Sequence, residues 1–288
     1  MSPAEPIKSS LGVRFQAVAP ARDTREVRAR HEANRAGWNE GARRYTDELE
    51  EAIAFLRAGG SNLHPIERAN LGDLRAWCGT AVHLQCASGR DTLSLWNEGA
   101  RQVVGIDISD VHIANAERLG RALGAPATWH RADVLDAPAS LDGTADLVYT
   151  GRGALCWLHD LDGWAAVIAR LLKPAGILHL FDDHPVTWLF EADSETWQFS
   201  GVDYFGHAER SQGWPATYIG ALDIPLDRQS PKFERLWPLA SIFTALRGAG
   251  LTIEHFGEHA DSYWDNFPNL KPEYRGLVPR AFSMVARR

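Results

Sequence analysis

The chain has 288 residues, of which 45% are hydrophobic and 23% charged. This composition is typical of a packed globular protein, and it excludes a fully disordered or collagen-like chain. The 30 Lys and Arg residues against 37 Asp and Glu give a net charge of -7. An acidic balance argues against broad electrostatic binding to nucleic acid and favours a small-molecule partner.

The cysteines and the apolar segments indicate the cellular setting. Cys78, Cys86 and Cys156 show neither CxxC pairing nor zinc spacing, and their odd number does not suit a disulfide framework. The N-terminal residues contain no uninterrupted apolar stretch of the signal-peptide kind, and no run of about 18 apolar residues occurs. We therefore expect a cytoplasmic protein without a membrane partner, either a monomer or a homodimer.

The N-terminal third is predicted to be a tail followed by a helical cap. Residues 1–33 lack periodicity and are expected to be a tail and linker. From Asn34 to Leu56, apolar residues recur every three or four positions, which predicts an amphipathic helix with Trp38 and Tyr45 on one face. We assign residues 34–76 to a helical cap and 34–288 to one domain.

The middle of the chain alternates short apolar runs with helical patterns. Strands are predicted at 81–86, 102–106, 127–130, 145–150 and 176–181, and helices at 91–96, 109–123 and 161–172. Parallel strands with right-handed crossovers follow from this alternation. A later helix at 239–246 and strands at 251–256 and 281–286 suit an antiparallel edge. The fold class is therefore α/β, a Rossmann-like, doubly wound, mostly parallel seven-stranded sheet.

Residues 186–235 interrupt this alternation and are interpreted as an insertion that forms a lid or a pocket wall. The segment from Val186 to Phe267 holds 15 of the chain's 28 aromatic residues. An aromatic acceptor pocket needs such residues, and so does a second small core under the insertion. The sequence leaves both alternatives open.

Small and acidic residues follow the first three strands. Gly89 lies in the turn after the first strand, Asp107 ends the second strand 18 residues later, and Asp133 follows the third. In open α/β sheets, ligands bind beyond the carboxyl ends of the strands. A small-residue turn lets a ligand approach the backbone, and a strand-ending acid can accept the hydroxyls of a ribose.

In their order and spacing, these segments resemble the class I S-adenosylmethionine (SAM)-dependent methyltransferases over residues 80–185. VHLQCASGRDTLSLWNEGARQVVGIDIS resembles the family's glycine-rich loop and second strand, RADVLDAP its adenine-contacting segment, and ADLVYTGRGALCWLHDLDGWAAVIARLLKPAGILHLFDDHP its fourth and fifth strands. The resemblance implies S-adenosyl-L-methionine as cofactor and S-adenosyl-L-homocysteine (SAH) as product. The cofactor-binding residues that it implies are Cys86, Ala87, Gly89, Asp107, Ile108, Asp133, Val134 and Thr150.

The glycine-rich loop departs from the family pattern. His83, Gln85 and Ala87 occupy the positions of the leading acid and the first two glycines, so only Gly89 remains. Ala87 is small, so a ligand can still approach the backbone closely. The acidic side chain that would contact the ammonium group of the methionine part of SAM is absent. The same departure argues more strongly against a dinucleotide-binding protein, because binding of the pyrophosphate depends on the tight glycine-rich turn.

For the acceptor, the resemblance implies a pocket at the fourth strand's end and the insertion. The substrate-binding candidates are Trp38, Trp157, Trp188 and Tyr204, and the catalytic candidates are Tyr45 and His184, the latter as general base in the pair Asp183-His184. His255 and His259 fall at a predicted strand end, so no metal site is expected.

We expect an enzyme that methylates a small, aromatic, indole-like acceptor in specialised metabolism by in-line displacement. The alternatives are a SAM-binding regulatory or accessory protein without turnover, and an O- or N-methyltransferase for a non-indole molecule.

Overall fold

The computed structural model describes residues 7–8, 13–215, 218–220 and 222–288. Its main sheet has seven strands in the order β10-β11-β7-β6-β3-β4-β5. The strands are β3 (Thr80–Leu84), β4 (Gln102–Asp107), β5 (Ala127–Arg131), β6 (Ala145–Gly151), β7 (Leu172–Asp183), β10 (Thr252–His259) and β11 (Ala281–Arg287). The predicted Rossmann-like doubly wound sheet is confirmed.

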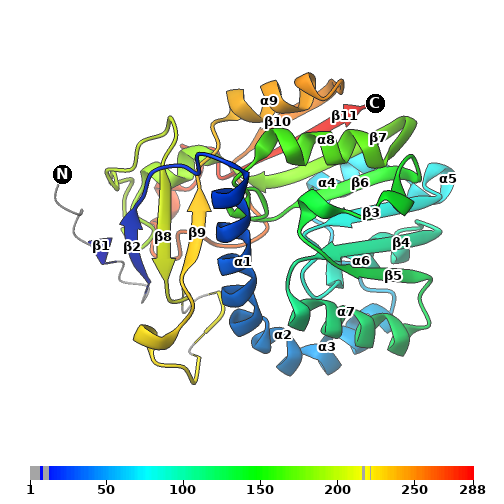
Figure 1. The fold of residues 1–288 in the computed structure, drawn as a ribbon, viewed down its shortest axis with the longest axis horizontal. Coiled ribbons are helices and arrows are strands. Elements are labelled where there is room, and N and C mark those ends of the chain that lie inside the picture. The colour runs from blue at the N-terminus through cyan, green and yellow to red at the C-terminus, as the bar shows by residue number, and fades with distance from the viewer. Residues whose placement is uncertain (1–6, 9–12, 216–217, 221) are drawn as a thin grey trace.

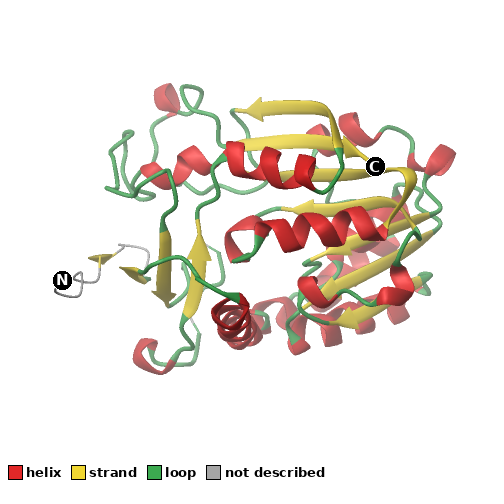
Figure 2. Ribbon diagram, turned by 45° about the horizontal axis from the view of Figure 1, so that its top comes forward, coloured by secondary structure: helices red, strands yellow, loops and turns green. Residues whose placement is uncertain are grey.

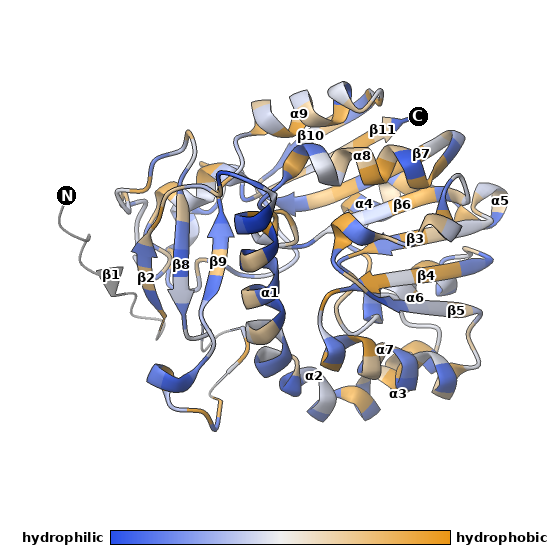
Figure 3. Cartoon of the chain, viewed as in Figure 1, coloured by the Kyte–Doolittle hydropathy of each residue, from blue (hydrophilic) through white to orange (hydrophobic). Residues whose placement is uncertain are grey.

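The central strands are parallel and buried on both faces. β3 pairs in parallel with β4 and β6, and the pairs β4–β5 and β6–β7 are also parallel. Long apolar runs cause this arrangement, because a strand covered on both faces needs side chains without unpaired polar groups; Figure 3 shows hydrophobic residues along β6, β3 and β4. β11 is antiparallel to β7 and to β10, so the reversed strand lies one position inside the edge.

Helices cover both faces of this sheet (Figure 2). One face packs against α8 (Leu161–Leu171) and α9 (Leu239–Gly248). The other face carries α3 (Leu49–Arg57), α4 (Pro65–Leu71), α5 (Leu74–Trp77), α6 (Arg90–Asn97) and α7 (Asp110–Leu123). The alternating strand and helix signals therefore produce two cores, one on each side of the sheet.

A second, antiparallel sheet lies beside the first and was not predicted. Its order is β1 (Ile7–Lys8), β2 (Arg14–Ala17), β8 (Ala208–Gln212) and β9 (Lys232–Arg235). Figure 1 shows α1 (Thr24–Gly41) between this sheet and the main one. Residues 186–235 thus supply two strands of a sheet that the N-terminal segment completes.

Two predictions for the N-terminal third are wrong. Residues 14–33 are not a tail, because β2 pairs with β8 and α1 begins at Thr24, where the side chain of Asp23 accepts from the backbone N–H of Glu26. The single helix predicted from Asn34 to Leu56 is instead α1, α2 (Arg43–Asp47) and α3. The two breaks turn the chain so that α1 faces the second sheet while α3 packs on α6 and α7.

No helix among the described residues is long and apolar enough to cross a membrane.

Candidate functional site

A cavity of about 640 Å³ opens at the carboxyl ends of the parallel strands, where α1, the main sheet and the second sheet meet. This is the place where open α/β sheets bind ligands. Many residues predicted from the sequence lie on its wall. They are Trp38, Tyr45, Cys86, Ala87, Asp107, Ile108, Asp133, Val134, Trp157 and Trp188.

The loop after β3 forms the part of the wall beneath the strand ends. Gln85 and Ala87 adopt the left-handed backbone region, with φ of 56° and 47°. Residues other than glycine rarely adopt this conformation, and they do so at sites where the surroundings hold them. Here the Gln85 side chain donates to the carbonyl oxygen of Ala154 over 2.8 Å. The loop keeps the turn although two of the family's glycines are absent.

Asp107 connects this loop to the end of β4. Its Oδ2 accepts the backbone N–H of Ala87 and its Oδ1 that of Ser109, both at 2.8 Å. Each oxygen of a carboxylate has room for a second hydrogen bond. Since Asp107 and the neighbouring Ile108 line the cavity, the carboxylate can still accept two ligand hydroxyls.

Gly89 is not on the cavity wall, so the structure does not support its prediction as a cofactor contact. Its φ is 82°, and a Cβ at this position would lie 2.6 Å from the Trp129 ring and 2.9 Å from Ala116. Gly89 is therefore required by the close packing of α6, α7 and β5. In dinucleotide-binding turns the third glycine serves the same purpose.

Asp133 lines the cavity and is held by two residues of α1. Its Oδ2 lies 2.8 Å from Nδ1 of His31 and 2.8 Å from a guanidinium nitrogen of Arg28, and its Oδ1 accepts from the backbone of Leu135. The hydrogen bond from His31 opposes desolvation, and the pKa of Asp133 lies below its usual value. A charged carboxylate with one remaining acceptor position faces the cavity next to Val134.

Aromatic rings from three segments lie together on the cavity wall. The Trp38 ring on α1 lies 4.6 Å from that of Trp214 and 5.3 Å from that of Trp157, measured between centroids. Tyr45 donates its hydroxyl to the hydroxyl of Tyr218 over 3.0 Å, and burial raises the pKa of Tyr45. Trp38 on α1 and Tyr45 on α2, which were predicted to share one helix face, thus both meet rings from the insertion.

His184, the predicted general base, is not among the residues that line the cavity. The ring is buried, with Nε2 2.9 Å from Glu258 on β10 and Nδ1 accepting the backbone N–H of Val186. Both ring nitrogens serve the turn after β7. Asp183, which precedes it in the predicted pair, lies on the cavity wall instead.

The Asp183 carboxylate has the environment of a proton acceptor. Trp264 donates its ring N–H to it over 3.2 Å. Burial and the neighbouring carboxylate of Asp182 raise the pKa of Asp183 above its usual value. Asp182 also lines the cavity, but it accepts the backbone N–H groups of Gly153 and Leu155 at 2.8 and 3.0 Å and so holds the loop after β6.

Thr150 and Tyr204 also lie away from the cavity wall. Thr150 is fully buried within β6, because its side chain points into the sheet's core rather than beyond the strand end. The Tyr204 hydroxyl accepts the backbone N–H of Leu239 over 3.4 Å, which places it at the start of α9. The structure therefore gives no support to their predicted roles as cofactor and acceptor contacts.

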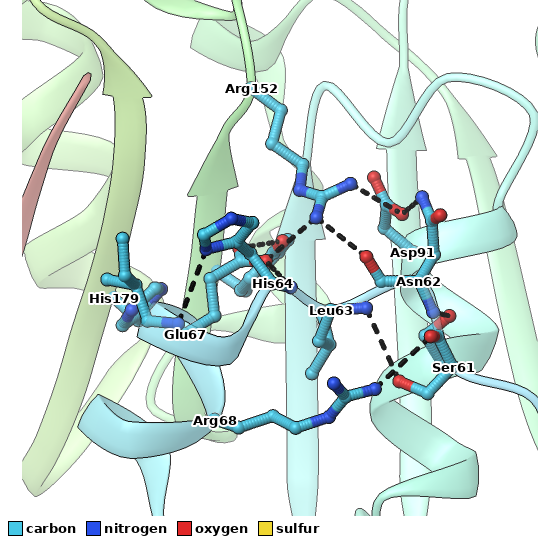
Figure 4. Close-up of polar contacts among 12 residues, drawn as sticks. Ser61, Asn62, Leu63, His64, Glu67, Arg68, Asp91, Arg152 and His179 are labelled. Carbon is cyan, nitrogen blue, oxygen red and sulfur yellow. Dashed lines mark hydrogen bonds and ion pairs between the residues drawn. The ribbon is translucent and has the colours of Figure 1, made fainter. Parts of the chain in front are cut away.

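A polar network that was not predicted closes the cavity beside the β3 loop (Figure 4). Arg152, with φ of 58° after β6, donates to Glu67 over 2.9 Å and to Asp91 over 3.3 Å. It also donates to the backbone oxygen of Asn62 over 2.7 Å. The signal for it was a charged residue directly after a buried strand, in Thr150-Gly151-Arg152-Gly153.

His83 takes the position of the family's leading acid and stays uncharged. It lies on the cavity wall with Nδ1 2.8 Å from the Thr92 hydroxyl. Burial lowers the pKa of His83 to about 4, so the ring is neutral at pH 7. Asp91, on the same wall, is the carboxylate closest in the sequence to the altered loop.

Comparison with known proteins agrees with this geometry. Residues 81–176 match the family model described as "Methyltransferase domain". Over this third of the chain the sequence is similar to a methyltransferase domain. The match begins in β3 and ends near the start of β7, so it covers β4, β5, β6 and the Asp107 and Asp133 positions. No curated protein sequence matches the chain.

Solved structures show the same fold beyond the matched segment. A SAM-dependent methyltransferase from Mesorhizobium loti is 23% identical, with a TM-score of 0.54 over 80% of this chain and 99% of that one. The Burkholderia thailandensis 1,6-didemethyltoxoflavin-N1-methyltransferase, solved with its substrate and SAH, is 19% identical, with a TM-score of 0.57 over 99% of each chain. The [4+2]-cyclase SpnF is 17% identical, with a TM-score of 0.53 over 85% of this chain and 94% of that one.

Proposed function

We propose that this protein is a SAM-dependent methyltransferase that acts on a small aromatic acceptor. The observation that carries the proposal is the hydrogen bond between Ala87 and Asp107 at the strand ends. Both residues line a cavity that also has aromatic rings on its wall. The methyltransferase domain supports the reaction class, and the rings support the acceptor class. An indole ring is the acceptor that we favour, in a reaction of specialised metabolism.

The residues present fit the cofactor. Asp107 has free acceptor positions for the ribose hydroxyls, and Ile108 beside it offers an apolar surface to the adenine. Asp133 retains an acceptor position for the adenine amine, while Val134 packs against the ring. Cys86 and Ala87 bring the backbone of the loop to the cavity. His83 replaces the family's leading acid, so we assign the contact with the ammonium group of the methionine part of SAM to Asp91.

When bound, SAM supplies an electrophilic methyl group on a sulfonium, which an acceptor atom displaces in line. The chain must therefore align the acceptor and exclude water. Trp38, Trp157 and Trp188, which all line the cavity, hold the acceptor ring. Their faces also suit a neighbouring cation, because aromatic rings attract positive charge.

Asp183 accepts a proton where the acceptor must lose one. Its raised pKa makes it a stronger base than an ordinary aspartate, and it lies on the cavity wall. Tyr45 stays protonated because burial raises its pKa, so its hydroxyl serves as a hydrogen-bond donor. This assignment replaces the predicted role of His184.

A second candidate is a SAM-binding regulatory or accessory protein without turnover, which the altered loop favours. The likeness to the [4+2]-cyclase SpnF shows that this fold is not restricted to proteins named as methyltransferases. An O- or N-methyltransferase for a non-indole molecule is the third, and the toxoflavin N1-methyltransferase has the same fold. We further propose a cytoplasmic protein, monomeric or dimeric, with residues 34–288 as its domain.

Two measurements separate these candidates. Calorimetry with SAH alone tests cofactor binding, and micromolar binding is expected. Mass spectrometry of reactions with SAM and a panel of indoles, phenols and amines then tests methyl transfer. Binding without any methylated product across the panel would favour the regulatory candidate. Absence of SAH binding would contradict all three candidates.

A further inference from the structure

The second sheet presents two glutamates to the cavity from neighbouring strands. Glu209 on β8 and Glu234 on β9 are directly opposite each other in the antiparallel register. Both residues line the cavity, as do Ser211 and Lys232 two positions along the same strands. The inward face of this sheet therefore carries a pair of carboxylates.

Each carboxylate has a protein partner on only one oxygen. The Ser211 hydroxyl donates to Oε1 of Glu234 over 2.6 Å, and the His207 ring lies 2.8 Å from Oε2 of Glu209. Among the contacts of the described residues, Oε2 of Glu234 and Oε1 of Glu209 have no donor. Glu209 is only 8% exposed, so its free oxygen meets the cavity rather than bulk solvent.

Lys232 acts on the pair only through its charge, which lowers the pKa of Glu234 but does not offset the raising effects of burial and Glu209. Lys232 donates to the carbonyl oxygen of Gly213, and its ammonium lies 4.3 Å from the centre of the Trp214 ring. Within the described residues it forms no ion pair with Glu209 or Glu234. His207 can compensate one carboxylate when protonated, but not both.

Such a pair is unfavourable in the protein alone. Like charges directly opposite on adjacent strands destabilise a sheet, and a buried carboxylate needs a hydrogen bond or a counter-charge. Burial and the charge of Glu209 raise the pKa of Glu234, which is the response of a carboxylate without sufficient cationic partners. A ligand cation between the two free oxygens would remove this penalty.

Aromatic rings flank the same position. The ring of Trp188 lies 6.1 Å from that of His207, the partner of Glu209. Trp214 lies beside Lys232, and its ring centre is 4.6 Å from that of Trp38. The cavity therefore combines an acidic wall with a lining of flat apolar rings.

We propose that the acceptor is an alkylamine that bears an aromatic ring, with its ammonium group held between Glu209 and Glu234 and its ring among the tryptophans. This proposal rests on the proposed function and names the substrate class of the same cavity. The glutamates act in recognition and need not lie next to the atom that is methylated.

The test uses three probes with one ring system and different charges, namely tryptamine, the neutral alcohol tryptophol and the anion indole-3-acetate. Calorimetry on the full chain is done with and without saturating SAH. We expect tryptamine to bind at least about tenfold more tightly than tryptophol, the scale of one charged hydrogen bond. Indole-3-acetate should bind most weakly.

Glu209→Gln and Glu234→Gln should each remove most of the preference for tryptamine and leave tryptophol binding unchanged. Glu254→Gln is the matched control, because Glu254 is a glutamate on β10 that does not line the cavity. Both cavity variants should also unfold at higher temperature than the wild type without ligand, which shows that they fold and that the pair is unfavourable.

Tryptamine that binds no more tightly than tryptophol, including no measurable binding of either, overturns the proposal. An unchanged preference in both glutamine variants overturns it equally. Failure of the methyltransferase function has a different signature, since SAH would then not bind while the amine preference persists in its absence.

Discussion

The backbone N–H of Ala87 donates to Oδ2 of Asp107 over 2.8 Å. This bond joins the loop after β3 to the end of β4, the two segments that the sequence places 20 residues apart. The loop lacks two glycines of the family pattern, so its left-handed turn needs support from the Asp107 carboxylate, which also lines the cavity. The carboxylate holds the left-handed turn at Ala87, and it offers its remaining lone pairs to the cavity.

Replacement of Asp107 by alanine should weaken SAH binding by about 1.5–3 kcal/mol, or roughly 10- to 150-fold, because hydrogen bonds to a charged group are lost. Calorimetry measures this directly. Glu117→Ala, an exposed change on α7, is the control. Equal SAH affinity in Asp107→Ala and wild type would contradict the ribose assignment.

Asp133→Asn should cause a smaller loss of SAH affinity, since the amide keeps the shape but one orientation presents a donor to the adenine amine. Asp136→Asn is a close control, because Asp136 shares the Arg28 guanidinium with Asp133 but does not line the cavity. If the two variants bind SAH alike, the adenine contact lies elsewhere. A cofactor-bound structure with Asp133 far from adenine would agree with that result.

Asp183→Asn should be more stable than the wild type at pH 8, with the difference shrinking towards pH 5. The folded protein raises the pKa of Asp183, so it binds the proton more tightly than the unfolded chain. Stability therefore falls as the pH rises from the unfolded pKa through the folded one. Urea denaturation at several pH values measures this trend, and exposed Asp227→Asn is the control.

In activity, Asp183→Asn should lower turnover of any acceptor that must lose a proton, whereas His184→Asn should retain it if the fold is kept. Mass-spectrometric product formation with SAM compares the two variants. A loss in His184→Asn alone would restore the histidine as the base.

Asn34→Ala should loosen α1 from the second sheet. The Asn34 side chain accepts the N–H of Phe233 over 2.7 Å and donates to its carbonyl over 2.8 Å. Leaving these buried groups unpaired costs about 1–3 kcal/mol. Hydrogen exchange should quicken in α1 and β9 but not in β3 or β6.

In the wild type, SAH with an acceptor should protect α1 and β9 further, because both segments are expected to close over the ligand. Uniform protection in all states would contradict this closure.

Gly89→Ala should destabilise the protein more than Gly124→Ala. Both glycines have positive φ, which costs about 1–2 kcal/mol for another residue. Only Gly89 would also place its Cβ 2.6 Å from Trp129, whereas nothing lies within 4 Å at Gly124. Overpacking adds about 1–3 kcal/mol. Equal midpoints in thermal unfolding would contradict a packing role for Gly89.

Much of the fold was readable from local pattern. The alternation of apolar runs and helical periodicity predicted β3 to β7 and their helices within a few residues, because burial on both sheet faces constrains each strand's composition. The strand-ending positions of Asp107 and Asp133 followed as well. Parallel strands end at one edge, so the topology alone brings these residues together.

The tertiary structure decided what depends on long-range pairing. β2 pairs with β8 across almost 200 residues of sequence. The local pattern of residues 14–17 does not predict this pairing. The direction of a side chain at a strand end was equally hidden, so that Asp183 faces the cavity and His184 turns to Glu258. The physical reason is that periodicity records which residues are buried, whereas register and packing between distant segments determine against what they are buried.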